Sequence, residues 1–335
     1  MALLVNDTSY SGTVASKFWL PATYGMDTLV KGAAYVVDGI KKTHTIERLD
    51  FSAPLQARAA TPVSSGNFTL DGKVLNPQDT MIYTEFNPRS LELNWLAEQL
   101  DPKLLVRELP ITAENYMIQM ALNRTFEQIE TGLWMGSKTY TAITGTPGNG
   151  QLKFWDGYLK KMVNDAAVQK VASPLPLTSG PTTVTNYNIL DALNALINIG
   201  VTNKKALFTN ASKFKRMRFF VSVLTEQIYQ DASVNIPLKG QLPQSGQAQP
   251  WKGYEVIALA GIPDNTIVFC EGLDDPSSNL YIGMNSEEDN DLEIKRVSNP
   301  SELFYFKGLM KYDVQYGFSE EIFLFTTLTP ASFNV

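Results

Sequence analysis

The chain has 335 residues, of which 44% are hydrophobic and 19% are charged, and this composition excludes a disordered or collagen-like protein. Its 28 basic and 34 acidic side chains give a net charge of −6, so the chain lacks the basic excess of proteins that wrap nucleic acid by neutralising phosphates. A single cysteine and a single histidine exclude an internal disulfide framework, cysteine-rich zinc sites and multi-histidine metal sites.

The beginning of the chain reads as an extended arm. Residues 1–40 contain several glycines and show no helical period. Phe18 and Trp19 are candidate contacts with a neighbouring subunit, and packing beneath their own domain is an equally good alternative. The start has no basic segment before an apolar run, and no uncharged apolar stretch approaches the roughly 20 residues that span a bilayer. We therefore expect neither export nor a membrane partner.

The next segment favours β-strands. Within residues 43–86, three runs favour strands, at 43–51, 67–70 and 81–86, and they suit a long hairpin. We expect the hairpin tip at Leu70, Asp71, Gly72 and Lys73, because a glycine after an aspartate accepts the positive φ of a type I′ turn. A two-stranded ribbon is only marginally stable alone in water, so it needs another surface, and another copy of the chain is the simplest source. This indicates a protein that assembles.

A long amphipathic helix is predicted over 112–135, with Thr112 as its N-cap and Gly136 as its stop. Apolar residues recur along one face at Ile118, Leu122, Phe126, Ile129 and Leu133. At 1.5 Å per residue this helix is roughly 35 Å long, about twice the average, and can act as a spine.

The second half of the chain mixes helices and strands. The Pro-, Ser- and Thr-rich stretch 173–185 is the best candidate for an internal linker. Apolar spacing predicts helices over 185–200 and 212–228 and strands over 205–209, 254–258, 266–270 and 280–283. Residues 304–318 alternate apolar with polar side chains, including Lys307, Lys311, Asp313 and Gln315 on the polar side. This alternation indicates strands covered on one face.

Four basic residues form the most unusual charge cluster. Lys213, Lys215, Arg216 and Arg218 crowd the first turns of a predicted helix, where the helix dipole disfavours each cation by roughly 0.3–1 kcal/mol. An acidic partner would explain the cluster, either DNA or the acidic run 287–293 of a neighbouring subunit. A solvated basic face is an equally good alternative.

No catalytic, cofactor or metal site is predicted. His44 reads as a solvated strand residue and Cys270 as a buried thiol in a strand. The acidic run 287–293 could hold calcium, but it lacks the glycine of an EF-hand loop, and a solvated loop is the better interpretation. The glycine-rich loop 144–150 lacks the Lys-Ser or Lys-Thr pair of a phosphate-binding loop, so we expect an ordinary turn there.

The order of these parts resembles the major capsid proteins of tailed bacteriophages, which have the Hong Kong 97-type fold. The resemblance is carried by the arm, the hairpin containing Asp71 and Gly72, the helix 112–135, the Ala-Gly-Ile-Pro-Asp turn at 260–264 and the closing strand 306–317. It implies an α+β fold without an enzymatic activity.

The resemblance also implies a domain organisation. Residues 1–40 would be the N-terminal arm and 41–90 the extended loop lying over a neighbouring subunit. Residues 91–154 and 298–335 would form the peripheral domain with its spine helix, and 155–297 the axial domain.

The function implied is that of a major capsid protein. Copies would assemble in the host cytoplasm into hexamers and pentamers of an icosahedral shell, the virion capsid, which encloses double-stranded DNA without sequence-specific binding. A portal protein would be a partner, with a separate scaffold or decoration protein or neither, because no scaffolding-like segment precedes the arm. Some relatives cross-link a loop lysine to a neighbouring asparagine. Lys73 is the lysine placed for this, but we do not expect the cross-link, because no partner is evident.

Two other classes compete with this one. A nanocompartment shell of the same fold would enclose an enzyme in place of DNA. A hydrolase would use carboxylates such as Asp264, Glu271, Asp274 and Asp275, but these form no recognisable paired-acid motif.

Overall fold

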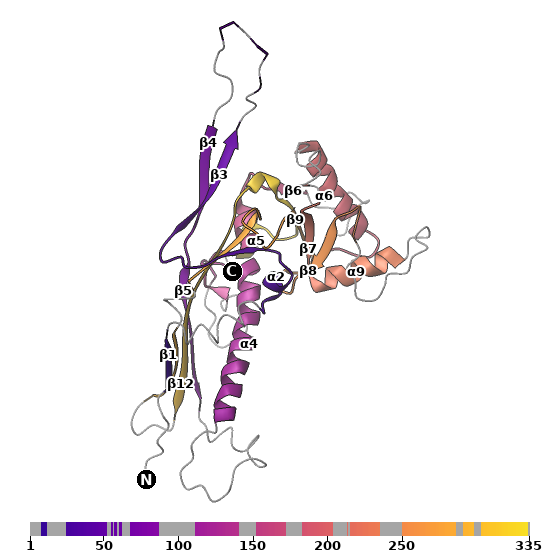
Figure 1. The fold of residues 1–335 in the computed structure, drawn as a ribbon. Helices are drawn as coiled ribbons and strands as arrows, with labels where there is room; N and C mark the ends of the chain where they lie inside the picture. The colour runs from indigo at the N-terminus through magenta and orange to yellow at the C-terminus, as the bar shows by residue number, and fades with distance from the viewer. Residues whose placement is uncertain are drawn as a thin grey trace, which may run out of the picture.

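The computed structural model of the protein describes residues 8–11, 25–51, 55, 57–58, 60–61, 68–86, 111–140, 152–171, 183–203, 213, 215–234, 250–285, 291–297 and 303–333. It has an α+β architecture, as predicted. Two sheets and a long helix form the body, and a two-stranded hairpin projects from it (Figure 1).

The larger sheet is organised around its longest strand. Its strands are β1 (Thr8–Ser11), β2 (Tyr35–Val37), β5 (Gln78–Phe86), β10 (Leu280–Met284), β11 (Asp291–Arg296) and β12 (Phe304–Tyr316). β12 pairs antiparallel with β5, β10 and β11, while β10 pairs parallel with β2. The alternation predicted for this segment is confirmed, because β12 alternates buried and half-buried residues from Phe304 to Tyr312. Asp313 is an exception, since it is buried and accepts hydrogen bonds from Lys161 and Asn76.

The second sheet has the strand order β6 (Gln169–Lys170), β13 (Phe323–Thr326), β9 (Thr266–Glu271), β7 (Met217–Val221) and β8 (Glu255–Ala258). Helices α6 (Ile189–Asn203) and α9 (Val223–Val234) contribute to its core. The strands predicted at 254–258, 266–270 and 280–283 are confirmed. The helix predicted over 185–200 is confirmed in α6, with the predicted face buried.

The helix predicted over 212–228 is wrong in its first half. Residues 217–221 form β7, which lies between β8 and β9, and the helix begins only at Val223. Phe219 and Phe220 are both fully buried, one in each of the two large core clusters of the body. A strand covered on both faces is apolar without alternation, so its residues fit a helical period by coincidence.

The spine helix is confirmed as α4 (Ile111–Met135), but Thr112 is not its N-cap, because it lies inside the first turn of the helix. Leu122, Phe126, Ile129 and Leu133 are buried, as the spacing predicted. Gly136 follows the helix, where a Cβ atom would lie 2.5 Å from the carbonyl oxygen of Gly132. The short helices α2 (Asp27–Val30) and α5 (Tyr158–Asn164) contribute to the same core, and the 3₁₀ turns η2 (Ser319–Glu321) and η3 (Pro330–Phe333) lie near the end of the chain.

The hairpin consists of β3 (His44–Phe51) and β4 (Phe68–Leu75), which pair antiparallel along their full lengths. The turn predicted at Asp71 and Gly72 is wrong, because these residues lie within β4, opposite Arg48 and Glu47. The glycine serves a close contact instead, since a Cβ atom on Gly72 would lie 2.6 Å from Cγ2 of Thr45. The strands are therefore connected through residues 52–67. The last strand-like run of the segment, at 81–86, belongs to β5 in the larger sheet.

Candidate assembly interface and hairpin root

The hairpin presents surface that the body of its own chain does not cover. It points away from the two sheets (Figure 1), and Leu55, in the connection between β3 and β4, is 94% exposed. Near the body, His44, Thr45 and Glu47 are exposed as well. The exposure of His44 in a strand agrees with the prediction. A ribbon of two strands with so little cover is a candidate for contact with another molecule.

The hairpin joins the body through a small apolar cluster. Ile40, Ile46 and Leu75 are buried together, with Val37 and Tyr281 packed against them. Burial of these side chains holds β3 and β4 against the larger sheet without fixing a direction, because hydrophobic contact is not directional.

Directional contacts come from Lys73 of β4. Its Nζ atom donates to Oγ of Ser319 at 2.6 Å and to Oδ2 of Asp165 at 3.2 Å, and it lies 3.7 Å from the centre of the Tyr316 ring. The Tyr316 hydroxyl donates to the same Asp165 oxygen at 3.0 Å. Lys73 was predicted at the hairpin tip, but it lies at the opposite end, in contact with its own chain.

Asp165 is held in its charged form. Burial alone would raise the pKa of this carboxyl, but hydrogen bonds from Ser319, the Ala167 backbone, Lys73 and Tyr316 outweigh burial and lower the pKa to about 2. The carboxylate that pairs with Lys73 is therefore charged throughout the neutral range.

A second set of polar contacts holds the residues that follow. Oδ2 of Asp313 accepts from the backbone N–H of Asn76 at 2.8 Å, and Oδ1 accepts from Nζ of Lys161 at 3.1 Å. Nε2 of Gln315 donates to the carbonyl oxygen of Val74 at 3.3 Å. We call residues 73–76, with these partners on the body, the hairpin root.

The end of helix α5 supplies one residue to each set. Lys161 lies in the last turn of the helix and Asp165 is the C-cap residue that follows it, and the two carry opposite charges. Lys161 pairs with Asp313 of β12, and Asp165 pairs with Lys73 of β4. Sequence reasoning missed these partners, because the pairs join segments 92 and 152 residues apart and only the polar pattern of β12 hinted at Asp313.

The basic cluster is largely paired within the protomer. Lys213 lies 2.9 Å from Glu321, and Arg216 lies 2.6 Å from Glu271 and 3.4 Å from Asp275. The helix-dipole argument fails here, since this segment leads into strand β7.

The other two members of the cluster differ from each other. Arg218 pairs with Glu255 at 3.0 Å and donates to the carbonyl oxygens of Gly32 and Gly272, each at 3.2 Å. Lys215 is exposed. A role of the cluster between subunits stays a prediction, and Lys215 is its most accessible member.

Glu130 of α4 is a buried carboxylate, 3% exposed. Its two oxygens accept from the backbone N–H of Thr28 at 3.2 Å and from the Thr28 hydroxyl at 2.5 Å, and Nε1 of Trp134 donates to that hydroxyl at 3.0 Å. Burial raises the pKa of Glu130, and the nearby Asp27 raises it further against the hydrogen bonds from Thr28 and Gly261. These contacts join α2 to the spine helix.

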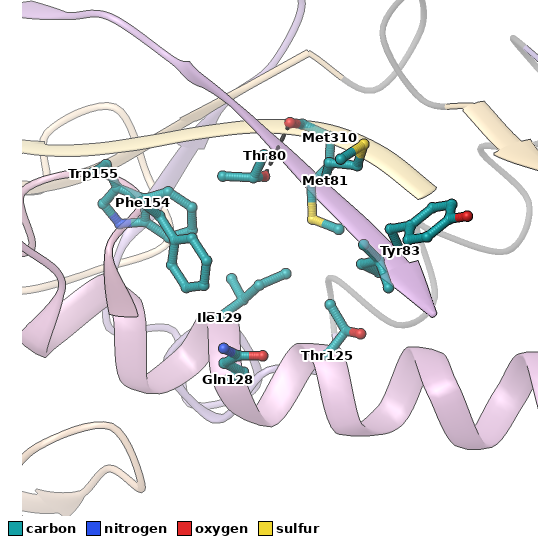
Figure 2. A pocket seen from close by; sticks show the side chains of 10 residues that line it. Thr80, Met81, Tyr83, Thr125, Gln128, Ile129, Phe154, Trp155 and Met310 are labelled. Atoms are coloured by element: carbon teal, nitrogen blue, oxygen red, sulfur yellow. Dashed lines mark hydrogen bonds between the residues drawn. The ribbon is translucent and has the colours of Figure 1, made fainter. Parts of the chain in front are cut away.

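A cavity of about 240 Å³ lies between β5 and α4 (Figure 2). Its lining comprises Thr80, Met81, Ile82, Tyr83, Thr125, Gln128, Ile129, Phe154, Trp155 and Met310. Figure 2 shows Met81 and Tyr83 of β5 above Thr125 and Gln128 of α4. This lining contains no carboxylate, histidine, cysteine or amine, and its three hydroxyl groups, on Thr80, Tyr83 and Thr125, donate to Met310, Glu85 and Ala121.

The other candidate chemical groups are engaged or inert. Cys270 is fully buried in β9, as predicted, and burial raises the pKa of its thiol well above the ordinary value. Of the carboxylates considered for a hydrolase, Asp264 accepts from the Ser222 hydroxyl at 2.8 Å, Glu271 pairs with Arg216, and Asp274 is exposed. Within the described part of the chain, no three His, Cys, Asp or Glu residues form a group that could hold a metal ion.

Several predictions concern residues outside this description. Phe18 and Trp19, the strand at 205–209 and the loop 144–150 lie outside the described residues, as do most of the linker and part of the acidic run. The backbone of Leu70 and Asp71 lies in β4, but their side chains are not described. Among the helices that the structure describes, none has the length and apolar character to cross a membrane.

Comparisons with known proteins give matches at the level of structure. No family model matches the chain, and no curated protein matches it in sequence. The satellite phage P4 procapsid including the size determination (Sid) protein is similar over 94% of this chain and 100% of that chain, with a TM-score of 0.58 and 11% identity. The capsid of the native GTA particle is similar over 90% of each chain, with a TM-score of 0.57 and 14% identity.

The mature capsid of bacteriophage PhiM1 is similar over 90% of this chain and 87% of that chain, with a TM-score of 0.51 and 13% identity. Each of these three matches covers at least 90% of this chain. The chain therefore has the Hong Kong 97-type fold, the fold of phage capsid proteins, as its sequence predicted.

Proposed function

We propose that this chain is the major capsid protein of a tailed bacteriophage. Copies of it assemble into hexamers and pentamers of an icosahedral shell that encloses double-stranded DNA. The observation that carries the proposal is the fold, which is shared over at least 87% of both chains with the capsid structures of P4, the GTA particle and PhiM1.

The physical character of the hairpin supports assembly. Its exposed apolar residue Leu55 and its two-stranded construction leave surface to be covered, and heterologous contacts between identical copies cover such surface when they close into rings. Residues 1–40, as an arm, and Phe18 and Trp19 would extend the same contacts. In this proposal residues 91–154 and 298–335 form the peripheral domain, and 155–297 form the axial domain at the ring centres.

The charge of the chain suits a container for DNA. A net charge of −6 disfavours tight binding of DNA to the shell wall, so the packaged molecule stays free to leave. The protein acts by geometry and not by catalysis, is assembled in the host cytoplasm and resides in the virion. A portal protein is a further partner.

The proposal is tested by electron microscopy of the purified protein, with sedimentation in parallel. We expect closed shells, or rings that convert to shells, and nuclease-protected double-stranded DNA in particles from the natural source. A stable compact monomer at high concentration, with the amides of β3 and β4 protected from hydrogen exchange, would contradict it. Shells that hold a protein cargo without nucleic acid would identify the nanocompartment class.

A further inference from the structure

Because the hairpin is long, a small rotation at its root produces a large displacement at its far end. The eight residue pairs of β3 and β4 extend over about 25 Å at 3.3 Å per residue, so a rotation of about 10° at the root displaces the far end of these strands by about 4 Å. Contacts between subunits are lost over such a distance, since packing is specific at the scale of single atoms. The direction of the hairpin therefore decides which contacts it can make.

The two kinds of contact at the root act differently. The cluster of Ile40, Ile46 and Leu75 supplies non-directional burial. Lys73 adds directional contacts, because its ammonium lies over the Tyr316 ring and donates to both Asp165 and Ser319. Tyr316 and Asp165 are fixed in turn by their own hydrogen bond, so Lys73 meets a rigid site.

We propose that Lys73 is a positioning residue that, through Asp165, Ser319 and Tyr316, fixes the direction in which the hairpin leaves the body and thereby sets the diameter of the shell. The first half of this inference concerns the single protomer, and the second half rests on the proposed function.

The direction of the hairpin can be measured by pulsed electron paramagnetic resonance on subunits kept unassembled by dilution. Spin labels are attached at Leu55→Cys, on the hairpin, and at Tyr187→Cys, on the body, which replace residues 94% and 87% exposed. The native Cys270 is fully buried and stays unlabelled. We expect a single narrow distance distribution for the otherwise unchanged chain.

The test variant is Lys73→Met, which keeps an apolar stem against the Tyr316 ring and removes the charge. Its matched control is Lys311→Met, which removes the 3.4 Å ion pair of Lys311 with Asp79 between β12 and β5, outside the root. We expect the distance distribution to broaden and shift in Lys73→Met and to stay unchanged in Lys311→Met. Lys73→Arg, which keeps the positive charge, should restore most of the narrow distribution.

Coupling to Asp165 separates positioning from a general loss of stability. If Lys73 acts through Asp165, the double variant Lys73→Met/Asp165→Asn broadens the distribution no more than the more disruptive single variant. Circular dichroism confirms that each variant is folded. Should Lys73→Met unfold, Ser319→Ala removes one acceptor of Lys73 together with the Ser319 hydrogen bond to Asp165, and it is expected to broaden the distribution to a smaller extent.

Shell diameter is then measured by electron microscopy on the same variants without labels. We expect Lys73→Met to lose shells of the wild-type diameter and to give mixed sizes or open sheets, while Lys311→Met gives wild-type shells. A Lys73→Met protein with the wild-type distance distribution overturns the proposal. A Lys73→Met protein that has a broadened distance distribution and still forms shells of the wild-type diameter overturns it as well. A wild-type chain that forms no shells contradicts the proposed function, while the distance measurement still tests the positioning role.

Discussion

At the scale of single residues, Glu130 gives the protein a pH-dependent stability. Because burial raises its pKa in the folded chain, the native state binds more protons than the unfolded state over the range between the two pKa values. The free energy of unfolding therefore decreases as pH rises through this range, and the contribution of Glu130 is most favourable on the acidic side.

Replacing Glu130 by glutamine removes this dependence. We expect the stability advantage of the wild-type chain over Glu130→Gln to shrink between about pH 5 and about pH 7.5. Urea unfolding of the unassembled protein at the two pH values measures the difference. An advantage that stays constant or grows with pH would contradict the assignment of a raised pKa to this carboxyl.

Arg216 is expected to stabilise the protomer. Glu271, its partner at 2.6 Å, has a side chain only 8% exposed, and burial raises the pKa of Glu271 despite the charges of Arg216 and Lys213. Arg216→Met leaves this carboxylate without its main partner, so we expect a loss of about 1–3 kcal/mol in the free energy of unfolding. The double variant Arg216→Met/Glu271→Gln should recover part of the loss, because it removes the buried charge.

Denaturant unfolding of Arg216→Met, Glu271→Gln and the double variant tests this pair. Additive losses in the double variant would show that the two residues do not interact.

Lys215→Glu is the informative variant for the role predicted between subunits or toward DNA, because Lys215 is exposed while Arg218 is engaged with Glu255. A change at Arg218 would perturb the protomer itself.

At the scale of elements, the spine helix crosses the turn between β8 and β9 closely. A Cβ atom at Gly261 would lie 2.4 Å from the carbonyl oxygen of Glu130 and 2.5 Å from Cδ1 of Trp134. Backbone cannot move away as a flexible side chain can. We expect Gly261→Ala to lower the free energy of unfolding by about 1–3 kcal/mol.

Gly132 within α4 offers a matched control. A Cβ atom there would lie 3.5 Å from its nearest neighbours, which is ordinary contact, and alanine is favoured over glycine in a helix by about 0.5–1 kcal/mol. Thermal unfolding should therefore show a lower Tm for Gly261→Ala and an equal or higher Tm for Gly132→Ala. An equal decrease in both would indicate that the crossing is not closely packed.

The elements also show what the sequence could predict. The α4 helix and the β12 strand were predictable because each has one buried face over many residues, so the period is unambiguous. The β7 strand was not, because both of its faces are buried and its apolar run has no alternation. The turn predicted at Asp71 and Gly72 was wrong for a different reason. A turn signal is local in the sequence, whereas the pairing of β3 with β4 continues on both sides of these two residues.

At the scale of the whole molecule, the two sheets are built from interleaved segments of the chain. β10 joins the sheet of β12, whereas β13, which follows β12 in the chain, joins the sheet of β9. One core cluster contains residues of α4, β9, β10 and β12 together. The boundaries predicted at 154 and 297 therefore stay a prediction, and the root partners of Lys73 could not be inferred because they meet only in this packed body.

The hairpin, by contrast, is separable from the body, and this allows a test at the level of the particle. Replacing residues 50–69 by Asn-Gly keeps Ile46, Leu75 and Lys73, so the apolar cluster and the contacts of the root remain. Leu49 and Leu70 face each other in the register, and a two-residue Asn-Gly connection suits such a pair. We expect the thermal unfolding of the unassembled protein to be nearly unchanged.

Assembly should be lost in the same variant. Without the far part of the hairpin, each copy lacks the surface proposed to cover its neighbour, so electron microscopy should show no closed shells under conditions in which the full chain forms them. A variant that folds and still forms wild-type shells would show that the hairpin is dispensable for closure, and contacts from other parts of the chain would then carry the assembly. A variant that fails to fold would show that the body depends on the hairpin, contrary to the separation of their cores.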